Sequence, residues 1–543
     1  MTNPPQTLLE RLLMKLHPLD RLNCALTCRL WADVVSKLPM SEEIDFVVRG
    51  PEVEPVQEAM VESQRMCGNL IFQRAKLYEF DPKFWGKFGE NLRELQLMGC
   101  DWSHEVLHSI LQSCPNLESL NIRLQDGRRN YCDRKNRESD SYDGGDREPL
   151  LRLRHFSLNT EDAAYWEIET LERIIDLMPN LTSLSLEVPR IEHIADIAEC
   201  MSELGLNLTQ LRVRTSELEE FLVKAILEDF SNSLEDLLLQ PCSELTDESY
   251  DALAACTKLR NLTLCNALRM ENRHLKKLAL SAPDLEVLEI ENSRLLTEDC
   301  LFYIGGLTKL RHLRFSACNL IDFSGVRVEG CPPLKTLRRL ELGLSSFTSL
   351  DDIHQLLSFE NLRSLILPHN HIQPEDFAFI IQSSSQLERL ELLCGKLSDH
   401  DGSKLHLLKN LKSLSLMDAD GFTHRTFEKG VGSPDMESLL IDSQTLTDRA
   451  MACIATHHAR LKHLALLYSE KVSDAALLNL LEHEPNLRTL RLDYCSFWND
   501  TLEGLVKLCP QLNRIWMEDG LYTEYTRSRF SRMRPSIYSH QLH

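Results

Sequence analysis

One hydrophobic phrase, Leu-x-x-Leu-x-Leu, recurs along most of this chain. Its first clear copy is Leu92, Leu95 and Leu97, and about 17 copies occur, most of them about 24 to 28 residues apart. Within a copy the last two leucines alternate with a variable residue, which is the period of a strand that buries one face. The sequence therefore predicts a short strand in every copy. The later copies open at Leu117, Leu153, Leu181, Leu208, Leu234, Leu259, Leu285, Leu310, Leu337, Leu362, Leu387, Leu411, Met436, Leu461, Leu487 and Leu512.

The stretches between the phrases carry the signal of a helix start. At Thr246, Thr297, Thr447 and Ser473 a hydroxyl residue precedes acidic residues and then apolar residues at helical spacing. Hydroxyl residues favour the N-cap of a helix, and acidic residues favour its first turn. One strand-turn-helix unit cannot bury its apolar side alone, so such units stack with a parallel sheet inside and helices outside. At about 4.8 Å per strand the sheet would be roughly 80 Å long, curved into a deep horseshoe or a near-closed ring.

A period in the twenties with this phrase resembles the leucine-rich repeats, an α/β solenoid fold. Cys100, Cys242, Cys318 and Cys495 each stand three residues after the final apolar residue of a phrase. This placement resembles the cysteine-containing, helical subclass of these repeats. It predicts a small buried thiol that fits a turn and donates a weak hydrogen bond, without a redox or metal role.

Four regions are expected from the pattern. The repeats occupy residues 91–517, and residues 46–90 read as irregular capping repeats with degenerate strands. The segment 125–149 is dense in Arg, Asp, Ser and Gly, which predicts a disordered insertion. The C-terminal tail, 518–543, carries aromatic residues and arginines, and either folds back into the concave face or stays free.

Residues 1–45 lie outside the repeats and form three short helical patterns. A three-helix module this small has little core of its own, so the solenoid or a partner must cover its apolar surplus. The first pattern is an apolar stripe at helical spacing. Its residues are Leu8, Leu9, Leu12, Leu13 and Leu16.

This module resembles the F-box, and with the repeats that follow it the whole chain resembles the F-box/leucine-rich-repeat family. The chain departs from the family pattern at Pro4, Thr7 and Leu13. The matching residues are Pro5, Leu9, Leu12, Leu16, Asp20, Leu22, Ala25, Leu26, Cys28 and Trp31.

The resemblance implies a substrate-recognition adaptor of an SCF-type cullin-RING ubiquitin ligase. In that family the F-box docks a Skp-family linker, which sits on a cullin-RING scaffold, and the repeats hold the protein substrate for ubiquitination. The docking residues carried over from the family are Pro5, Leu8, Leu9, Leu12, Leu13, Leu16 and Trp31.

The variable residues beside the last two leucines of each phrase are predicted to face the concave side. Charged residues occupy many of these positions, among them Arg314, Glu289, Glu341 and Glu391, and later repeats carry apolar residues instead. An exposed apolar patch on a repeat surface is typical of an interaction site, so we expect a substrate-binding patch there. Its residues are Ile366, Leu393, Met417, Leu440, Leu467 and Trp516.

Charge and cysteine content exclude several classes of protein. The net charge of −22 argues against broad binding to nucleic acids or anionic membranes. Seventeen cysteines, an odd number spread through 543 residues, do not form the disulfide framework of a small secreted protein. The sequence shows neither a signal peptide nor an apolar run long enough to span a membrane. A cytoplasmic or nuclear location is expected.

No catalytic, metal or cofactor site is predicted. In His369-Asn370-His371 the Asn occupies the repeat turn, and Cys453, His457, His458 and His463 fit no usual zinc spacing. Phosphate-binding glycine loops and nucleophile elbows do not occur. Two function classes remain: the ligase adaptor, and a protein-binding scaffold whose N-terminal helices only cap the solenoid. Binding to a Skp-family linker distinguishes them.

Overall fold

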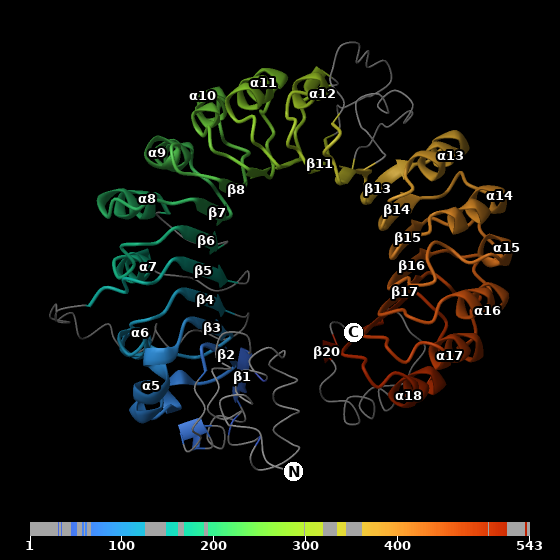
Figure 1. Cartoon of the computed structure of the whole chain (residues 1–543), viewed down its shortest axis with the longest axis horizontal. Coiled ribbons are helices and arrows are strands. Elements are labelled where there is room, and N and C mark those ends of the chain that lie inside the picture. Colours follow the sequence, from blue (N-terminus) through green and yellow to red (C-terminus); the bar gives the residue numbers. More distant parts are fainter. Residues whose placement is uncertain are drawn as a thin grey trace. The chain divides into compact units, whose positions relative to one another are not determined.

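The described part of the chain forms two compact units, unit 1 (Met1–Leu259) and unit 2 (Arg260–His543). In each unit parallel strands lie on the inner side and helices on the outer side (Figure 1). Each unit is described by itself. The computed structural model describes residues 13, 31, 34, 45–50, 57–58, 60–61, 67–124, 148–160, 168–188, 194–297, 299–318, 334–343, 361–497, 499–517 and 538–539.

The sheet of unit 1 is parallel, and each of its strands pairs with the next along the chain. Its first two strands precede Leu92, where the sequence predicts degenerate capping strands. The strands are β1 (Asp45–Arg49), β2 (Asn69–Gln73), β3 (Glu94–Met98), β4 (Ser119–Leu124), β5 (His155–Thr160), β6 (Ser183–Glu187), β7 (Gln210–Arg214) and β8 (Asp236–Gln240).

The sheet of unit 2 is built in the same way, with each strand parallel to the next. Every Leu-x-x-Leu-x-Leu phrase of the sequence coincides with one strand from β3 to β19, which confirms the predicted repeat. The strands are β9 (Asn261–Leu264), β10 (Val287–Glu291), β11 (His312–Ser316), β12 (Arg339–Gly343), β13 (Ser364–His371), β14 (Arg389–Leu393), β15 (Ser413–Met417), β16 (Ser438–Asp442), β17 (His463–Leu467), β18 (Thr489–Asp493), β19 (Arg514–Trp516) and β20 (Tyr538–Ser539).

Helices cover the outer side of both sheets. In unit 1 they are α5 (Pro82–Phe88), α6 (His104–Gln112), α7 (Ile168–Ile175), α8 (Ile194–Glu203), α9 (Glu220–Phe230) and α10 (Asp247–Ala252). In unit 2 they are α11 (Asn272–Ser281), α12 (Asp299–Ile304), α13 (Pro374–Ser383), α14 (Asp399–Gly402), α15 (His424–Phe427), α16 (Asp448–His457), α17 (Asp474–Glu482) and α18 (Asn499–Leu508). The predicted α/β leucine-rich-repeat solenoid, with the sheet inside and the helices outside, is confirmed.

The core lies between each sheet and its helices. In β3 the burial alternates residue by residue, so that Leu95 and Leu97 are buried while Glu94 and Gln96 stay half-exposed. The leucines of the other phrases are buried in the same way. Burying one leucine side chain stabilises the fold by about 1.5 to 3 kcal/mol, so the repeated phrase supplies the main driving force for stacking.

The acidic first turn of some helices has a role beyond the local helix start. The predicted starts at Asp247, Asp448 and Asp474 are confirmed. The carboxylate of Asp448 accepts hydrogen bonds from the backbone N–H (2.7 Å) and the hydroxyl (2.8 Å) of Ser473, the N-cap of the next helix. The acidic first turn of α16 therefore ties its repeat to the next one.

The turn cysteines are buried, as the sequence predicts. The thiol of Cys100 donates to the carbonyl oxygen of Phe72 at 3.4 Å, and that of Cys495 donates to Leu466 at 3.4 Å, each one repeat earlier. Burial raises the pKa of both thiols to about 11, so they stay protonated and act as weak hydrogen-bond donors.

The C-terminal tail contributes one described segment, β20, which pairs in parallel with β19. The sequence predicts a tail that either folds into the concave face or stays free. The described segment does neither, because it adds a strand to the edge of the sheet. A backbone edge with unpaired N–H and C=O groups is a ready partner for such a strand. The remainder of the tail, the insertion at 125–147 and most of the F-box module lie outside the described residues.

Glu484 provides a test of the core of unit 2. It is fully buried and accepts one hydrogen bond, from the backbone N–H of Leu461 at 2.8 Å. Burial raises its pKa from 4.5 to about 7. The folded state therefore holds this proton more tightly than the unfolded state, and the stability that Glu484 contributes falls as the pH rises from about 4.5 to about 7.

We expect Glu484→Gln to leave stability nearly unchanged at pH 5 and to raise the free energy of unfolding at pH 8 by up to about 3 kcal/mol. Urea unfolding followed by circular dichroism at the two pH values measures this difference. Glu482→Gln, an exposed position on α17, is the matched control and should show no such dependence. An equal effect of Glu484→Gln at both pH values would contradict the titration.

Candidate protein-binding site

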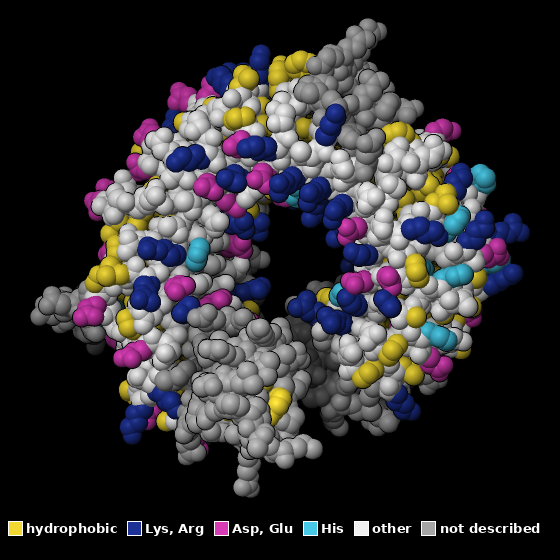
Figure 2. Space-filling view, viewed as in Figure 1, with side chains coloured by type: hydrophobic (Ala, Val, Ile, Leu, Met, Phe, Trp, Pro, Cys, Tyr) yellow, Lys and Arg dark blue, Asp and Glu magenta, His cyan; other side chains and the backbone are white. Residues whose placement is uncertain are grey.

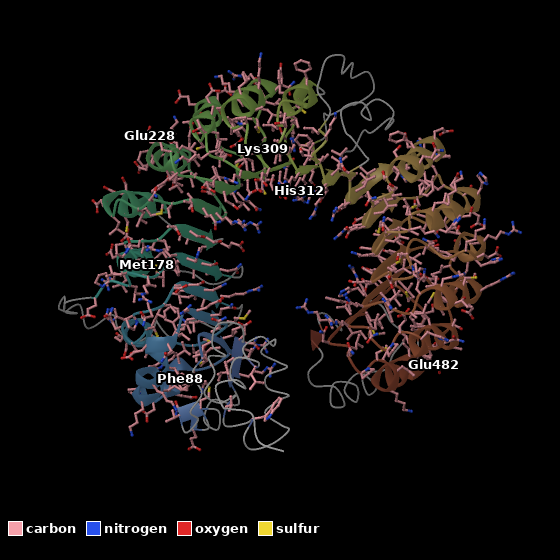
Figure 3. All side chains as sticks on the ribbon, viewed as in Figure 1. Phe88, Met178, Glu228, Lys309, His312 and Glu482 are labelled. Atoms are coloured by element: carbon pink, nitrogen blue, oxygen red, sulfur yellow. The ribbon has the colours of Figure 1, made fainter. Side chains whose placement is uncertain are left out.

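The inner face of the unit 2 sheet is the candidate site, because the register of the strands aligns its variable residues in straight rows. One row runs from Glu289 on β10 through Arg314, Glu341 and Ile366 to Glu391 on β14. Figure 3 shows His312 on the inner side of this sheet, whereas Glu482 lies among the outer helices. Side chains of this face are therefore presented away from the helices.

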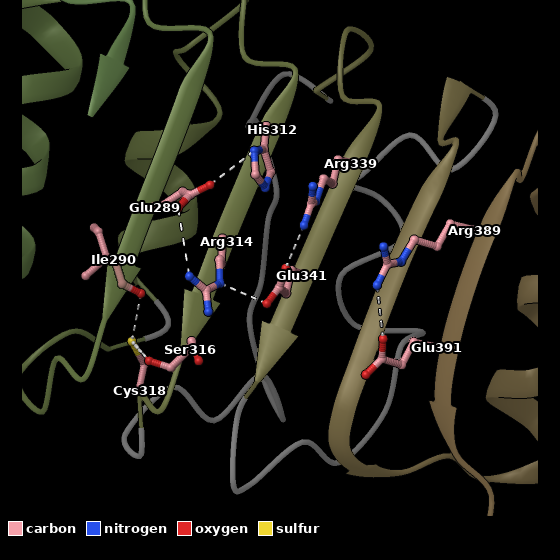
Figure 4. Close-up of polar contacts among 10 residues, drawn as sticks. All are labelled: Glu289, Ile290, His312, Arg314, Ser316, Cys318, Arg339, Glu341, Arg389 and Glu391. Carbon is pink, nitrogen blue, oxygen red and sulfur yellow. Dashed lines mark hydrogen bonds and ion pairs between the residues drawn. The ribbon is translucent and has the colours of Figure 1, made fainter. Parts of the chain in front are cut away.

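An ion-pair network crosses three strands of this face (Figure 4). Arg314 Nε lies 2.8 Å from Glu341 Oε1, and Arg314 Nη1 lies 3.9 Å from Glu289 Oε2. Arg339 reaches the other oxygen of Glu341 at 3.3 Å. Carboxylate and guanidinium thus alternate across the sheet, which fixes the orientation of long side chains that would otherwise be mobile.

His312 lies beside this network and is mostly buried. Its Nδ1 is 3.4 Å from Glu289 Oε1. Burial lowers the pKa of His312, with the nearby arginines adding to the effect and the glutamates opposing it. The ring is therefore neutral at pH 7. Its buried Nε2 has no hydrogen-bond partner among the described residues.

The predicted apolar patch is only partly exposed. Ile366 and Leu467 are 4% and 8% exposed, so the prediction that they present apolar surface is wrong. Ile366 stands in register between Glu341 and Glu391, and Leu467 stands between Asp442 and Asp493. Leu393, Met417, Leu440 and Trp516 are half-exposed.

The half-exposed members form one close pair and two separate positions. Leu393 and Met417 face each other as register partners on β14 and β15. Leu440 lies between Ser415 and Ala465 in the neighbouring row. Trp516 pairs with Arg491 at the end of the sheet. The binding role of these residues stays a prediction.

Two exposed tyrosines were missed by the sequence analysis. The rings of Tyr468 and Tyr494 stack with centroids 4.8 Å apart and planes inclined by 2°. Both residues have φ of +54°, in the turn position where other repeats place Asn266 or Asn292. A left-handed conformation costs a bulky residue about 1 to 2 kcal/mol, which stacking offsets by roughly 0.5 to 1.5 kcal/mol. Their common position directly after a strand phrase was the available signal.

Two predicted docking residues of the F-box are described. Leu13 is 1% exposed and Trp31 is half-buried. Leu13 therefore packs inside the protein in this structure, and its place in a docking surface stays a prediction. The other docking residues lie outside the described residues: Pro5, Leu8, Leu9, Leu12 and Leu16.

The histidine and cysteine cluster noted in the sequence is dispersed in the structure. His457 Nε2 lies 2.9 Å from the carbonyl oxygen of Glu428, and buried His458 accepts from the N–H of Val431 at 3.4 Å. Among the described residues no group of His, Cys, Asp or Glu is arranged to hold a metal ion. None of the described helices combines the length and apolar character that crossing a membrane requires.

Comparison with known proteins gives two matching family models. One, described as F-box domain, matches residues 5–41. The other, described as FBD-associated F-box protein At5g56370, LRR repeats, matches residues 329–468. The second range overlaps the candidate site from β12 to β17.

Solved structures of leucine-rich-repeat and other proteins are also similar to this chain at low identity. The yeast Rad7 and Elc1 complex has 16% identity and a TM-score of 0.41, covering 64% of this chain and 87% of that chain. The Leptospira interrogans LRR protein LIC12759 has 14% identity and a TM-score of 0.34, covering 91% and 100% respectively. The mouse RP105/MD-1 complex has 15% identity and a TM-score of 0.36, covering 88% and 74%.

The repeat model agrees with the strand phrases and with the repeat structure of the described chain. The F-box model precedes the repeats, in the order that the sequence resemblance implies. The chain therefore combines a match to the F-box domain with leucine-rich repeats, and in this it is similar to F-box/leucine-rich-repeat proteins.

Proposed function

We propose that this protein is the substrate-recognition adaptor of an SCF-type cullin-RING ubiquitin ligase. The observation that carries the proposal is the F-box match at residues 5–41 in front of repeats whose inner face presents rows of variable side chains. A module with an apolar surplus suits docking to a linker, and a long repeat surface suits capture of a protein. The protein then acts by bringing a substrate to the ligase and supplies no catalytic group of its own.

Docking to the linker is assigned to the apolar stripe of the F-box, with Leu9 and Leu12 at its centre. Complete burial of one leucine contributes about 1.5 to 3 kcal/mol, so a few of them account for a stable complex. The linker in turn connects the protein to the cullin-RING scaffold.

Substrate capture is assigned to the inner face of unit 2. Leu393 and Met417 supply adjacent half-exposed apolar surface, and Leu440 lies one row away. The Glu289–Arg314–Glu341 network on the same face supplies charged groups of fixed orientation. Apolar anchors give affinity, and charge complementarity gives partner selection and a faster encounter.

A cytoplasmic or nuclear location belongs to this proposal. The described cysteines are free thiols, most of them buried, which suits a reducing compartment. Fluorescence microscopy of a tagged full chain tests this location, and accumulation in a secretory compartment would contradict it.

We expect co-expression with a Skp-family linker to give a one-to-one complex by size exclusion and mass measurement. Leu9→Asp combined with Leu12→Asp should weaken it at least about a hundredfold, because two buried apolar contacts become charged. Leu280→Asp with Leu407→Asp is the matched control, since both leucines are exposed on the outer side of unit 2. A chain that elutes alone, with its circular dichroism spectrum intact, would instead favour a binding scaffold capped by its N-terminal helices.

A second expectation concerns the inner face. Leu393→Ser, Met417→Ser and Leu440→Ser together should reduce ubiquitin-dependent substrates recovered with the complex by roughly tenfold, as measured by quantitative mass spectrometry. Leu280→Ser with Leu407→Ser serves as the control on the outer side. Unchanged recovery, with linker binding retained, would remove these three residues from the substrate site.

A further inference from the structure

A second feature of unit 2 is a row of charged residues at the start of its strands. The residue that follows the first leucine of each phrase donates its backbone N–H to the carbonyl of the equivalent residue one repeat earlier. These hydrogen bonds hold the row on a rigid framework at the N-terminal edge of the sheet. The row, named the edge row here, contains Arg260, Glu286, Arg311, Arg338, Arg363, Glu388, Lys412, Glu437, Lys462 and Arg488.

Three arginines stand next to one another in the middle of the edge row. The N–H of Arg338 donates to Arg311 at 2.8 Å, and that of Arg363 donates to Arg338 at 2.8 Å. Like charges on adjacent strands, about 4.8 Å apart, are destabilising. The fold alone therefore gives no reason to place cations on both sides of Arg338.

The acidic residues of the edge row do not balance its cations. Glu286 and Glu388 are each shared by two cations, and Arg338 has no ion-pair partner among the described residues. The arginine side chains in these pairs remain more than half exposed. The nitrogen-to-oxygen distances are Arg260–Glu286 3.4 Å, Arg311–Glu286 3.3 Å, Arg363–Glu388 3.3 Å and Lys412–Glu388 3.1 Å.

Arg339 and Arg389 enlarge the positive surface beside the edge row. They begin β12 and β14, and about half of each side chain is exposed. Each is paired with a glutamate two residues further along its own strand, Glu341 at 3.3 Å and Glu391 at 3.5 Å. Figure 2 shows Lys and Arg side chains gathered along the inner rim of unit 2.

The same positions in unit 1 carry no run of adjacent cations, so the cluster of positive charge in unit 2 is not a requirement of the repeat. The equivalent row of unit 1 has the same backbone hydrogen bonds but no two adjacent cations. Arg93 pairs with Glu118 at 4.0 Å, and Arg154 donates to the carbonyl oxygen of Asn180 at 2.7 Å. That row contains Arg93, Glu118, Arg154, Thr182, Thr209 and Glu235.

We propose that Arg311, Arg338 and Arg363, with Arg339 and Arg389, bind an acidic segment of a partner polypeptide, rich in Asp and Glu, that crosses β11 to β14. Three strand spacings span about 14 Å, which an extended segment of about four or five residues covers. Guanidinium groups bind carboxylates through paired hydrogen bonds, so rows of exposed arginine suit this ligand. A nucleic acid fits less well, because the chain as a whole carries a net charge of −22.

The binding site itself is independent of the F-box. Only the identification of the acidic segment with a ligase substrate rests on the proposed function. Leu393 and Met417 lie at the opposite, C-terminal ends of β14 and β15. A substrate with an acidic segment next to an apolar one would therefore contact both ends of these strands.

The test uses the full chain, with its linker where the two form a complex, and a fluorescein-labelled peptide of alternating Glu and Asp. Fluorescence anisotropy should show binding that weakens steeply as salt rises from 50 to 300 mM, and no binding of the matched Gln and Asn peptide. Arg338→Glu with Arg363→Glu should weaken peptide binding about tenfold or more. Arg93→Glu with Arg154→Glu, the same reversal in unit 1, should change it less than about twofold.

A second variant separates binding from folding. Arg338→Gln removes the repulsion between neighbours, so its unfolding temperature should not fall while peptide affinity drops by roughly threefold. Two results would overturn the proposal. One is an equal loss of peptide affinity in the charge-reversal variants of unit 1 and of unit 2, and the other is tighter binding of a single-stranded oligonucleotide than of the peptide. If the full chain forms no complex with the linker but still binds the peptide, the edge row is supported and only the ligase role is contradicted.

Discussion

The fold depends on one constraint, the shared register of the parallel strands. Each strand pairs with the next at equivalent positions, as in Glu289–Arg314 and Arg314–Glu341. The register places the leucines of successive repeats on one side, where they bury against the helices, and the variable residues in rows on the other. A slip of one residue in any pairing would turn leucines to solvent and charges into the core, so the hydrophobic effect fixes the register strongly.

The rows determine which charged and apolar side chains interact on the inner face and at the edge of the sheet. A residue on one strand meets its equivalent about 4.8 Å away, close enough for charges to interact strongly and for side chains to cover one another. The Glu289–Arg314–Glu341 network is one result, and the uncompensated run around Arg338 in the edge row is another. The first satisfies its charges within the sheet. The second leaves positive charge exposed to solvent, which favours binding of an acidic partner.

The turns after the strands add a further level of contact between repeats. The thiol of Cys100 and the carboxylate of Asp448 both form hydrogen bonds to backbone or side-chain groups one repeat away. These contacts make neighbouring repeats mutually dependent, which is the basis of stability in a solenoid. Tyr468 and Tyr494 occupy the left-handed position of the same turns and compensate by stacking on each other. The C-terminal edge of the sheet therefore carries exposed aromatic rings at these two positions, whereas the edge row at its N-terminal edge is rich in arginine and lysine.

The sequence alone determined the strands, the helix starts at Asp448 and Asp474, and the buried turn cysteines, because each depends on residues close together in the chain. It also indicated which residues face inwards, since that follows from a period of two. Only the tertiary structure decided how those residues behave once stacked. Ile366 and Leu467 are buried within the stacked repeats, Glu286 is shared between two arginines, and burial raises the pKa of Glu484 to about 7. Each of these effects joins residues about one repeat apart or more, and local pattern carries no information on such contacts.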